Sequence, residues 1–586
     1  MSRILVVDLT SASSHSDELI TEGTLGLGGK VLGIRLLEKY LDPTADPLSP
    51  GNVMAITSSL VSAYGVYGSN RFGAFTKGPL TGIWLECYCG GTFARIMTET
   101  GWDAVVIKGA AATPVRLHIT AEGAEIVPAG DLWGKDTSIT EDEVLARLEK
   151  RSAVLSIGVA GENLVKVASI MHEKAHCLGR GGIGAVLGSK KLKAVSVTSS
   201  GPLKAQPQQQ FEEYRRKVVE DAKDAPATRN YHLYGTPIMT GLVNAAGAFP
   251  TDFFEKGEAP HRATLEVERW AEWCRIESDS CPPCQLRCRK RLIVTAGPNA
   301  GREIHAPEYE TIYSFGGSCM VEHAFDVARL NERCNLLGMD TMSTGNLAAI
   351  AIKAREAGHL TEGPAAGDTD SILQLLDEIA TRSTPTGDAL AQGTDEALAA
   401  FDMRDRSITS KKMDPAGYEP RRLKGMALSY ALSPRGACHL RATFYKPELT
   451  GLLKGLDDDA YVETYLDWED RMLLMDSFTM CRFYRDLLSW DFFLSAATQL
   501  NGAPVTKEDL RKLCDETLAR IRRLNFAFGV TPAADTVAER FFNEPTDKAP
   551  ALDRAELERR VRLYWIKRGW SEEGYPAALE PAARGA

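Results

Sequence analysis

Hydrophobic residues follow two different patterns along this chain. In the first two hundred residues they form short apolar runs, as at residues 4–7, 53–56, 104–107 and 194–197, and glycine-bearing turns separate these runs. Short apolar runs bounded by turn residues are typical of buried β-strands. From about residue 202 onward, charged and apolar residues recur with helical spacing instead. The pattern predicts a β-rich N-terminal part followed by a mainly helical remainder.

The helical part contains local signals that divide it further. Residues 347–357 and 372–380 have the pattern of amphipathic helices, whereas the Gly-, Pro- and Ser-rich segments 363–370 and 383–387 indicate loops. A turn-rich segment at residues 413–420 indicates a second boundary near Lys411. We therefore expect three domains, at residues 1–200, 201–410 and 411–586.

Length, charge and apolar content limit the class of protein. A chain of 586 residues exceeds the size of one hydrophobic core. A formal net charge of -10 argues against general nucleic-acid binding, which requires a basic face. No apolar stretch approaches the roughly 18 residues of a membrane span, and no N-terminal signal for secretion is evident. We therefore expect a cytoplasmic protein with few or no disulfides among its 12 cysteines.

Three of these cysteines are closely spaced. Cys281, Cys284 and Cys288 form a CxxCxxxC segment, a spacing that lets one short loop direct three thiolates at a 4Fe-4S cube. A cube needs four such ligands, so a fourth cysteine must come from elsewhere. Zinc is the main alternative, although no second CxxC pair is present, and buried structural thiols are a further alternative.

Glycine-rich segments occur four times in the β-rich part, at residues 26–30, 77–82, 89–91 and 179–184. Backbone amides in such loops can bind phosphate groups, and Arg71, Lys77 and Arg180 are nearby in the sequence. None of the segments matches the P-loop or the dinucleotide-binding fingerprint. From the residues alone, phosphate binding and ordinary β-turns both remain open.

Several further motifs follow in a fixed order. They are PEYET at residues 307–311, GGSC at 316–319, NLLGMDTMS at 335–343, SPRGACH at 433–439 and DSFTMC at 476–481. Together with the cysteine triplet and the glycine-rich segments, this order resembles the aldehyde ferredoxin oxidoreductase family of tungsten (less often molybdenum) pterin enzymes. The resemblance implies an α/β (α+β) fold, in which a β-rich N-terminal pterin-base domain precedes two mainly α-helical domains.

The resemblance also implies a set of cofactor-binding residues. The fourth ligand of the cube is Cys481, the last residue of the DSFTMC segment. Contacts to a bis-pterin metal cofactor, with Mg²⁺ bridging the pterin phosphates, are expected from nine residues: Arg71, Lys77, Gly90, Gly91, Arg180, Gly181, Asp340, Asp476 and Arg441. Two positions depart from the family pattern, because Asn335 replaces an acidic residue and Thr479 replaces a glycine.

By the same resemblance, proton transfer is assigned to Glu310 and His439, and Tyr418 is expected beside them. A carboxyl group in a dry pocket has a raised pKa and histidine titrates near neutrality, so either accepts a proton at physiological pH. Glu308 is the alternative to Glu310. Cys319 follows shortly after, and as a metal ligand it would alter the chemistry.

The family implies oxidation of a small aldehyde to a carboxylic acid, with electrons leaving through the cube to ferredoxin or to a small iron-sulfur subunit. A homodimer or a hetero-oligomer is expected, without the interfacial iron site of some family members. One alternative is a low-potential reductase of the same family that acts on an aromatic thioester, as benzoyl-CoA reductase does. The other is a non-catalytic iron-sulfur or zinc binding subunit. The sequence leaves tungsten and molybdenum both open.

Overall fold

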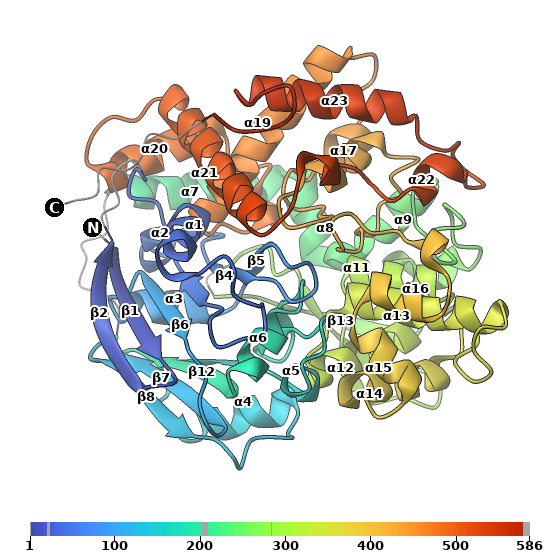
Figure 1. The fold of residues 1–586 in the computed structure, drawn as a ribbon, viewed down its shortest axis with the longest axis horizontal. Helices are drawn as coiled ribbons and strands as arrows, with labels where there is room; N and C mark the ends of the chain where they lie inside the picture. The colour runs from blue at the N-terminus through green and yellow to red at the C-terminus, as the bar shows by residue number, and fades with distance from the viewer. Residues whose placement is uncertain (1, 20–23, 202–208, 283, 578–586) are drawn as a thin grey trace.

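The N-terminal part contains two six-stranded mixed sheets (Figure 1). The computed structural model describes residues 2–19, 24–201, 209–282 and 284–577. The first sheet consists of β1 (Ser2–Asp8), β2 (Ser13–Leu19), β3 (Met54–Thr57), β4 (Phe72–Lys77), β5 (Trp84–Cys89) and β6 (Ala104–Lys108), in the order β2-β1-β6-β3-β4-β5. The second consists of β7 (Val115–Thr120), β8 (Gly123–Pro128), β9 (Ser152–Ser156), β10 (Ile170–His172), β11 (His176–Leu178) and β12 (Leu192–Thr198), in the order β11-β10-β9-β12-β7-β8.

The central strands of the first sheet are buried on both faces. In β1, Leu5 and Val7 belong to the largest hydrophobic cluster, whereas Ile4 and Val6 belong to a second cluster on the opposite face. Successive side chains of a strand point to opposite faces, so a strand covered on both faces needs an unbroken apolar run. The four apolar runs that predicted strands are found in β1, β3, β6 and β12.

Helices cover both sheets. Within the N-terminal part they are α1 (Gly29–Tyr40), α2 (Leu60–Ala63), α3 (Phe93–Glu99), α4 (Thr137–Leu145), α5 (Val159–Glu162) and α6 (Ile183–Ser189). α1 packs on β3 and β4, and α3 and α4 pack on the second sheet. The last residue of β12 is Thr198, and the next element that the structure describes begins at Gln209.

The remainder is mainly helical, as the sequence predicts. Its helices are α7 (Gln209–Asp224), α8 (Pro226–Tyr234), α9 (Met239–Ala245), α10 (Arg262–Leu265), α11 (Tyr309–Thr311), α12 (Ala324–Leu337), α13 (Thr341–Glu356), α14 (Thr369–Thr381), α15 (Pro385–Ala391), α16 (Thr394–Ala400), α17 (Lys424–Leu432), α18 (Tyr445–Leu449), α19 (Asp458–Ser477), α20 (Trp490–Asn501), α21 (Lys507–Ala527), α22 (Arg540–Asn543) and α23 (Arg554–Lys567). A π-helix, η3 (Ile312–Ser318), continues α11, and short 3-10 helices lie between other elements.

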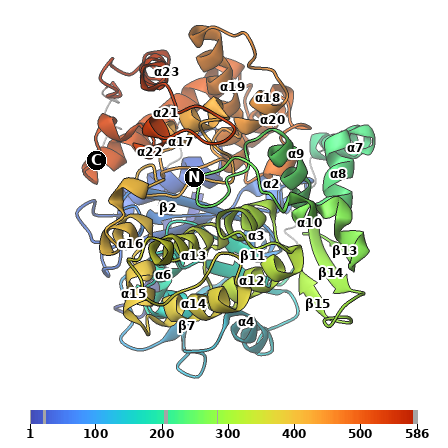
Figure 2. The ribbon, with the colours of Figure 1, turned by 90° about the vertical axis from the view of Figure 1, so that its right-hand side faces the viewer.

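A small antiparallel sheet interrupts the helical part, and the sequence did not predict it. It consists of β13 (Cys274–Asp279), β14 (Arg289–Val294) and β15 (Glu303–His305). Figure 2 shows this sheet at the edge of the molecule, below α7 and α8. The cysteine triplet lies in the loop that joins β13 to β14.

The two predicted loops of the helical part are partly wrong. The amphipathic segments 347–357 and 372–380 lie within α13 and α14 as expected, apart from the last residue of the first, but α14 already begins at Thr369. Segment 383–387 starts a helix, because the Thr384 side chain accepts a hydrogen bond from the Gly387 amide, 3.0 Å long, and Pro385 occupies the first turn. Thr, Pro and Gly at a helix N-terminus resemble a turn in the sequence.

The C-terminal helices pack directly on the N-terminal part. α1 contacts α19 and α21, and α21 reaches β5 (Figure 1). The Gly29 backbone has a φ of +49°, and a Cβ atom there would lie 2.0 Å from the Asp476 carbonyl oxygen at the end of α19. The close approach of the two parts therefore depends on a glycine at this position.

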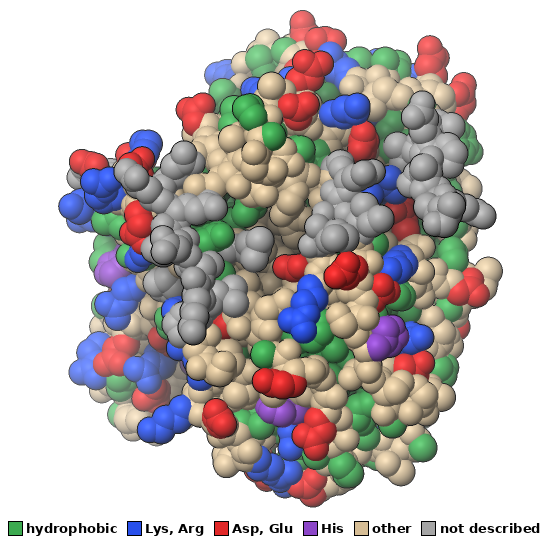
Figure 3. All heavy atoms as spheres, turned by 90° about the vertical axis from the view of Figure 1, so that its left-hand side faces the viewer, with side chains coloured by type: hydrophobic (Ala, Val, Ile, Leu, Met, Phe, Trp, Pro, Cys, Tyr) green, Lys and Arg blue, Asp and Glu red, His purple; other side chains and the backbone are tan. Residues whose placement is uncertain are grey.

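The surface carries charges of both signs. Figure 3 shows acidic and basic side chains interspersed over one face. Within the described part of the chain, no helix is both long enough and apolar enough to cross a membrane.

The Gly29 contact gives a stability prediction. Gly29→Ala introduces both a left-handed alanine, at roughly 1–2 kcal/mol, and overpacking, at about 1–3 kcal/mol. Gly502→Ala is the matched control, because Gly502 has a φ of +73° but no atom within 4 Å of the added Cβ. We expect thermal unfolding to show a clearly larger drop in midpoint for Gly29→Ala. Equal drops would contradict the tight contact.

Candidate active site

A cavity of about 340 Å³ lies where the β-rich part meets the helical remainder. Its lining comes from all three of the regions predicted as domains, residues 1–200, 201–410 and 411–586. Arg71, Gly90 and His176 contribute from the β-rich part, and the remaining lining includes Cys281, Cys284, Cys288, Glu308, Tyr309, Glu310, Tyr418, His439, Tyr445 and Cys481. The cavity therefore brings together the predicted cluster cysteines and the predicted proton-transfer residues.

The cysteine loop is held from several sides. β13 and β14 pair up to Asp279 and Arg289, so the loop is closed at its base. The Asn70 side-chain amide donates to the carbonyl oxygens of Cys281, at 3.2 Å, and Pro282, at 2.9 Å. These bonds fix the path of the loop against the segment that follows α2.

The same segment fixes Cys481. The Cys481 amide donates to the Gly68 carbonyl oxygen at 2.7 Å, and the Arg71 amide donates to the Thr479 carbonyl oxygen at 3.3 Å. Thr479 has a φ of +53°, a left-handed conformation that is unfavourable for a β-branched residue and ordinary for the family's glycine. The turn is therefore kept in this chain despite the substitution.

The four thiols influence one another. Burial, together with the neighbouring thiols of Cys481 and Cys284, raises the pKa of Cys281 to about 12. Burial and the same neighbours raise the pKa of Cys288 well above its ordinary value. A positive metal centre is what turns such thiols into thiolates. No three His, Cys, Asp or Glu side chains of the described residues form a group suited to one metal ion.

One polar contact to the cysteine loop was not predicted. His176 Nε2 lies 3.3 Å from Cys281 Sγ, and His176 Nδ1 lies 3.3 Å from a carboxylate oxygen of Glu173. Burial raises the pKa of Glu173, but the hydrogen bond from His176 and further contacts outweigh it and hold that pKa well below its ordinary value. The carboxylate therefore orients the imidazole toward the sulfur.

Glu310 and His439 form a largely buried pair on another part of the lining, with side chains 16% and 12% exposed. Glu310 Oε1 lies 3.3 Å from His439 Nε2, and Oε2 accepts a hydrogen bond from the Gly417 amide at 2.8 Å. Burial raises the pKa of Glu310 to about 8. Burial and then the charge of Arg180 lower the pKa of His439 well below its ordinary value. At neutral pH the pair therefore combines a protonated acid with a neutral imidazole.

Local structure explains the position of Glu310. It lies in α11, directly before the π-helix η3, and π-helical segments are frequent at functional sites. Tyr418 stacks on Tyr445 with ring centroids 4.1 Å apart, and its ring centroid lies 5.8 Å from that of His439. Glu308 lines the same cavity and accepts a hydrogen bond from the Thr236 hydroxyl.

Arg180 and Asp340 form a buried ion pair outside the cavity lining. Arg180 Nε donates to Asp340 Oδ2 at 3.2 Å, and the Asp340 side chain also caps α13 through the Met342 amide. Asp414 lies 3.8 Å from Arg180, and burial raises the pKa of Asp414 to about 6. Its Oδ2 atom is buried without a hydrogen-bond partner in the described chain.

Arg441 and Asp476 belong to a second buried charge network. Arg441 lies 2.8 Å from Glu86 and 2.9 Å from Asp476, and Arg482 also pairs with Asp476 at 2.6 Å. Lys30 completes the network through Glu86, at 2.9 Å. With Lys30, three cationic side chains share two carboxylates here, which suits an anionic ligand.

The remaining predicted residues differ in their distance from the cavity. Arg71 lines it and donates to the Tyr88 carbonyl oxygen at 3.0 Å, and a Cβ atom on Gly90 would lie 3.3 Å from Cys281 Sγ. Gly91, with a φ of +100°, faces His172. Lys77, Gly91, Gly181, Arg441 and Asp476 are not part of the lining. Lys77 binds the carbonyl oxygens of Pro43 and Ala45, both at 2.9 Å, and Gly181 packs against Leu85.

Cys319 is fully buried outside the cavity lining, and its thiol donates to the Gly345 carbonyl oxygen at 3.1 Å. Cys438, in contrast, accepts a hydrogen bond from Arg435 at 3.0 Å. Burial raises its pKa, but Arg435 and Arg441 outweigh burial, so the pKa falls to about 7. Cys438 lies in the SPRGACH motif, but no role was assigned to it from the sequence. Sequence reasoning missed His176, Cys177, Tyr231 and Arg485 in the lining, because none stands in a motif of its own.

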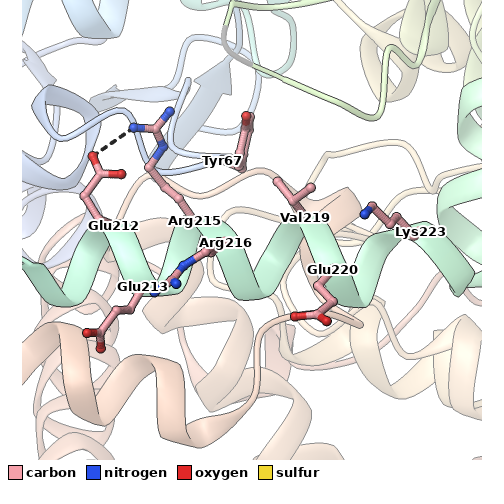
Figure 4. A pocket seen from close by; sticks show the side chains of 8 residues that line it. All are labelled: Tyr67, Glu212, Glu213, Arg215, Arg216, Val219, Glu220 and Lys223. Carbon is pink, nitrogen blue, oxygen red and sulfur yellow. Dashed lines mark hydrogen bonds and ion pairs between the residues drawn. The ribbon is translucent and has the colours of Figure 1, made fainter.

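A separate groove runs along α7, away from these residues. Figure 4 shows its lining side chains, which include Tyr67 and Val219 and equal numbers of acidic and basic residues. Glu212 and Arg215 form an ion pair there, 3.0 Å apart. The groove shows no convergence of catalytic groups.

A cavity that combines four cysteines with a buried acid and histidine is typical of an oxidoreductase. Residues 4–199 match the family domain described as "Aldehyde ferredoxin oxidoreductase, N-terminal domain", and residues 213–580 match "Aldehyde ferredoxin oxidoreductase, domains 2 & 3". The chain therefore belongs to the aldehyde ferredoxin oxidoreductase family of enzymes.

Individual relatives agree with this assignment. The chain is 32% identical over 602 residues to the tungsten-containing aldehyde ferredoxin oxidoreductase of Pyrococcus furiosus, and 31% identical over 589 residues to that of Thermococcus kodakarensis. Each alignment covers 98% of this chain and 96% of the relative. The fold is also that of a solved structure, the active site complex of benzoyl coenzyme A reductase with 1,5-dienoyl-CoA, with a TM-score of 0.83 at 20% identity, covering 98% of this chain and 95% of the other.

The fourth cluster ligand can be tested by mutation. Cys481→Ser should lower the iron content by at least about one atom per chain and alter the electron paramagnetic resonance signal of the reduced cluster, because serine is a harder ligand than thiolate. Cys514→Ser is the control, since Cys514 is buried in α21 and its thiol donates to the Asp470 carbonyl oxygen at 3.8 Å. Unchanged iron and an unchanged signal in Cys481→Ser would remove Cys481 from the ligand set.

Proposed function

We propose that this protein is a tungsten (or molybdenum) bis-pterin oxidoreductase that oxidises aldehydes to carboxylic acids and transfers electrons through a 4Fe-4S cluster. The observation that carries the proposal is the shared cavity, in which the Glu310–His439 pair and the four cysteines face one space. The names of the relatives from Pyrococcus furiosus and Thermococcus kodakarensis support tungsten and an aldehyde substrate.

The residues present fit both cofactors. Cys281, Cys284, Cys288 and Cys481 are the candidate cluster ligands, with four mutually interacting thiols as a cube requires. Arg71, Arg180, Asp340, Arg441 and Asp476 are the residues that would hold the pterins, and Mg²⁺ would neutralise part of their phosphate charge. Asp414 Oδ2, which is buried without a hydrogen bond, and the excess of cationic side chains over carboxylates around Glu86 and Asp476 support a polar ligand beside them.

The metal-pterin group supplies two-electron redox chemistry when it is bound, and the cluster supplies single-electron transfer. Oxidation of an aldehyde with one water molecule gives a carboxylic acid, two electrons and two protons. Glu310 Oε1 lies 3.3 Å from His439 Nε2 in the cavity lining, so Glu310 can accept the substrate proton once it has lost its own, with the neutral imidazole beside it. Tyr418 and Tyr445 shield this pair from solvent by stacking beside it.

The electron acceptor that fits this arrangement is ferredoxin or a small iron-sulfur subunit, docked near the β13–β14 loop at the edge of the molecule (Figure 2). A homodimer or a hetero-oligomer is part of the proposal. The aromatic thioester alternative loses its specific support, since Cys319 is not part of the cavity lining.

Glu310→Gln tests the proton-transfer role. A glutamine keeps the shape but cannot accept the proton, so turnover should fall by roughly 100-fold or more while metal content is unchanged. In the parent enzyme, kcat should rise as pH increases through about 8, because Glu310 must lose its proton to act as a base. This limb should be absent from the residual activity of Glu310→Gln.

Glu308→Gln is the matched control, since Glu308 lines the same cavity and is also held by a hydrogen bond. We expect it to keep the pH limb and most of the turnover. A parent-like pH profile in Glu310→Gln together with inactivity of Glu308→Gln would transfer the role to Glu308.

A further inference from the structure

One side of the cavity carries a buried cation without an acidic partner. Arg485 is 5% exposed and lines the cavity. Its NH1 group donates to the Arg482 carbonyl oxygen at 3.0 Å and its NH2 group to the Tyr231 hydroxyl at 3.4 Å, whereas Nε has no hydrogen-bond partner. The neighbouring Asp486 pairs with Lys446 instead. No carboxylate of the described residues forms an ion pair with Arg485.

Three other arginines differ in this respect, whereas Arg71, which is only partly buried, also forms no ion pair with a carboxylate of the described residues. Arg180, Arg441 and Arg482 each lie within 3.2 Å of a carboxylate oxygen. A buried charge that lacks a partner is unfavourable unless a ligand of opposite charge binds to it. The unpaired guanidinium of Arg485 therefore points to a missing anion rather than to structural charge balance.

The free donors of Arg485 have a defined geometry. Two of its five N–H groups are used by Arg482 and Tyr231, which leaves Nε–H and one N–H on each terminal nitrogen. Nε–H and the adjacent N–H form the fork that binds a carboxylate through both oxygens. The Tyr231 hydroxyl accepts from Arg485 and so keeps its own proton available to donate.

Aromatic rings hold these donors in place. Tyr231 stacks on Phe483 with centroids 4.5 Å apart, and the Arg485 guanidinium lies 5.9 Å from the centre of the Tyr445 ring. Tyr445 in turn stacks on Tyr418, beside His439. The charge of Arg485 also contributes to the lowered pKa of His439. One continuous lining thus connects the anion donors with the Glu310–His439 pair.

We propose that Arg485 and Tyr231 bind a carboxylate at the far end of the substrate, so that the substrate is a small ω-oxo acid, an aldehyde that carries a second, anionic group. This inference rests on the proposed aldehyde oxidation. It specifies the substrate class of the same site. An uncharged aldehyde would leave the buried guanidinium without a partner.

Binding to the metal-loaded enzyme provides the first test. Calorimetry should show that succinate, the dicarboxylate product analogue, binds at least about 30-fold more tightly than butyrate, which lacks the second carboxylate. Arg485→Leu should remove this difference, and Arg485→Lys should keep part of it because lysine retains the charge without the fork. Tyr231→Phe should weaken succinate by a smaller factor and leave butyrate unchanged. Equal binding of both acids by the parent would overturn the proposal.

Turnover provides the second test. kcat/KM for 4-oxobutanoate should exceed that for butanal in the parent, mainly through a lower KM, and Arg485→Leu should abolish the preference while butanal turnover persists. Arg275→Leu is the control, since the Arg275 side chain is 65% exposed outside the cavity. Loss of tungsten, molybdenum or pterin from Arg485→Leu would instead make Arg485 a cofactor contact and overturn the proposal.

The outcomes separate this inference from the proposed function. If neither aldehyde is oxidised but succinate binding depends on Arg485, the anion site is supported and aldehyde oxidation fails. If butanal and 4-oxobutanoate are oxidised equally well by the parent and by Arg485→Leu, aldehyde oxidation is supported and the anion site fails.

Discussion

The site depends on one short segment, residues 66–71, which contacts both parts of the cysteine set. Asn70 binds the backbone of the cysteine loop, and Gly68 accepts the Cys481 amide. Gly68 has a φ of +89°, and any side chain there would meet the Tyr484 ring at 2.8 Å. This segment follows α2 of the β-rich part. The cluster cysteines, which belong to the helical remainder, are therefore fixed against the β-rich part at the cavity.

Burial then determines the chemistry of the cavity. In a low-dielectric interior, charges interact over longer distances and unpaired groups change their protonation. Burial raises the pKa of Glu310 to about 8, whereas burial and several arginines lower the pKa of His439. The acid rather than the imidazole therefore holds the proton at neutral pH. Among these arginines, Arg180 pairs with Asp340 and Arg441 with Glu86 and Asp476, whereas Arg485 has no ion pair with a carboxylate of the described residues.

The sequence predicted the fold class and its β-rich to helical order, since apolar runs and helical periodicity are local signals. The CxxCxxxC spacing identified the cysteine loop, and the ordered motifs of the family added Cys481, Glu310 and His439. The β13–β15 sheet was missed because its strands are half exposed and β13 and β14 carry several charged residues instead of an apolar run. Arg485, Tyr231 and His176 could not be found, because each comes from a different element and only long-range packing brings them to one cavity.

The central claim is that this cavity holds a pterin-bound metal beside an iron-sulfur cube. Its most direct test is to purify the protein without oxygen from cells supplied with tungstate and molybdate, and to measure W, Mo, Fe and Zn per chain by elemental mass spectrometry. We predict about one W or Mo atom together with about four Fe atoms. Zinc alone, or iron without W, Mo or pterin, would contradict the claim and favour a non-catalytic metal-binding subunit.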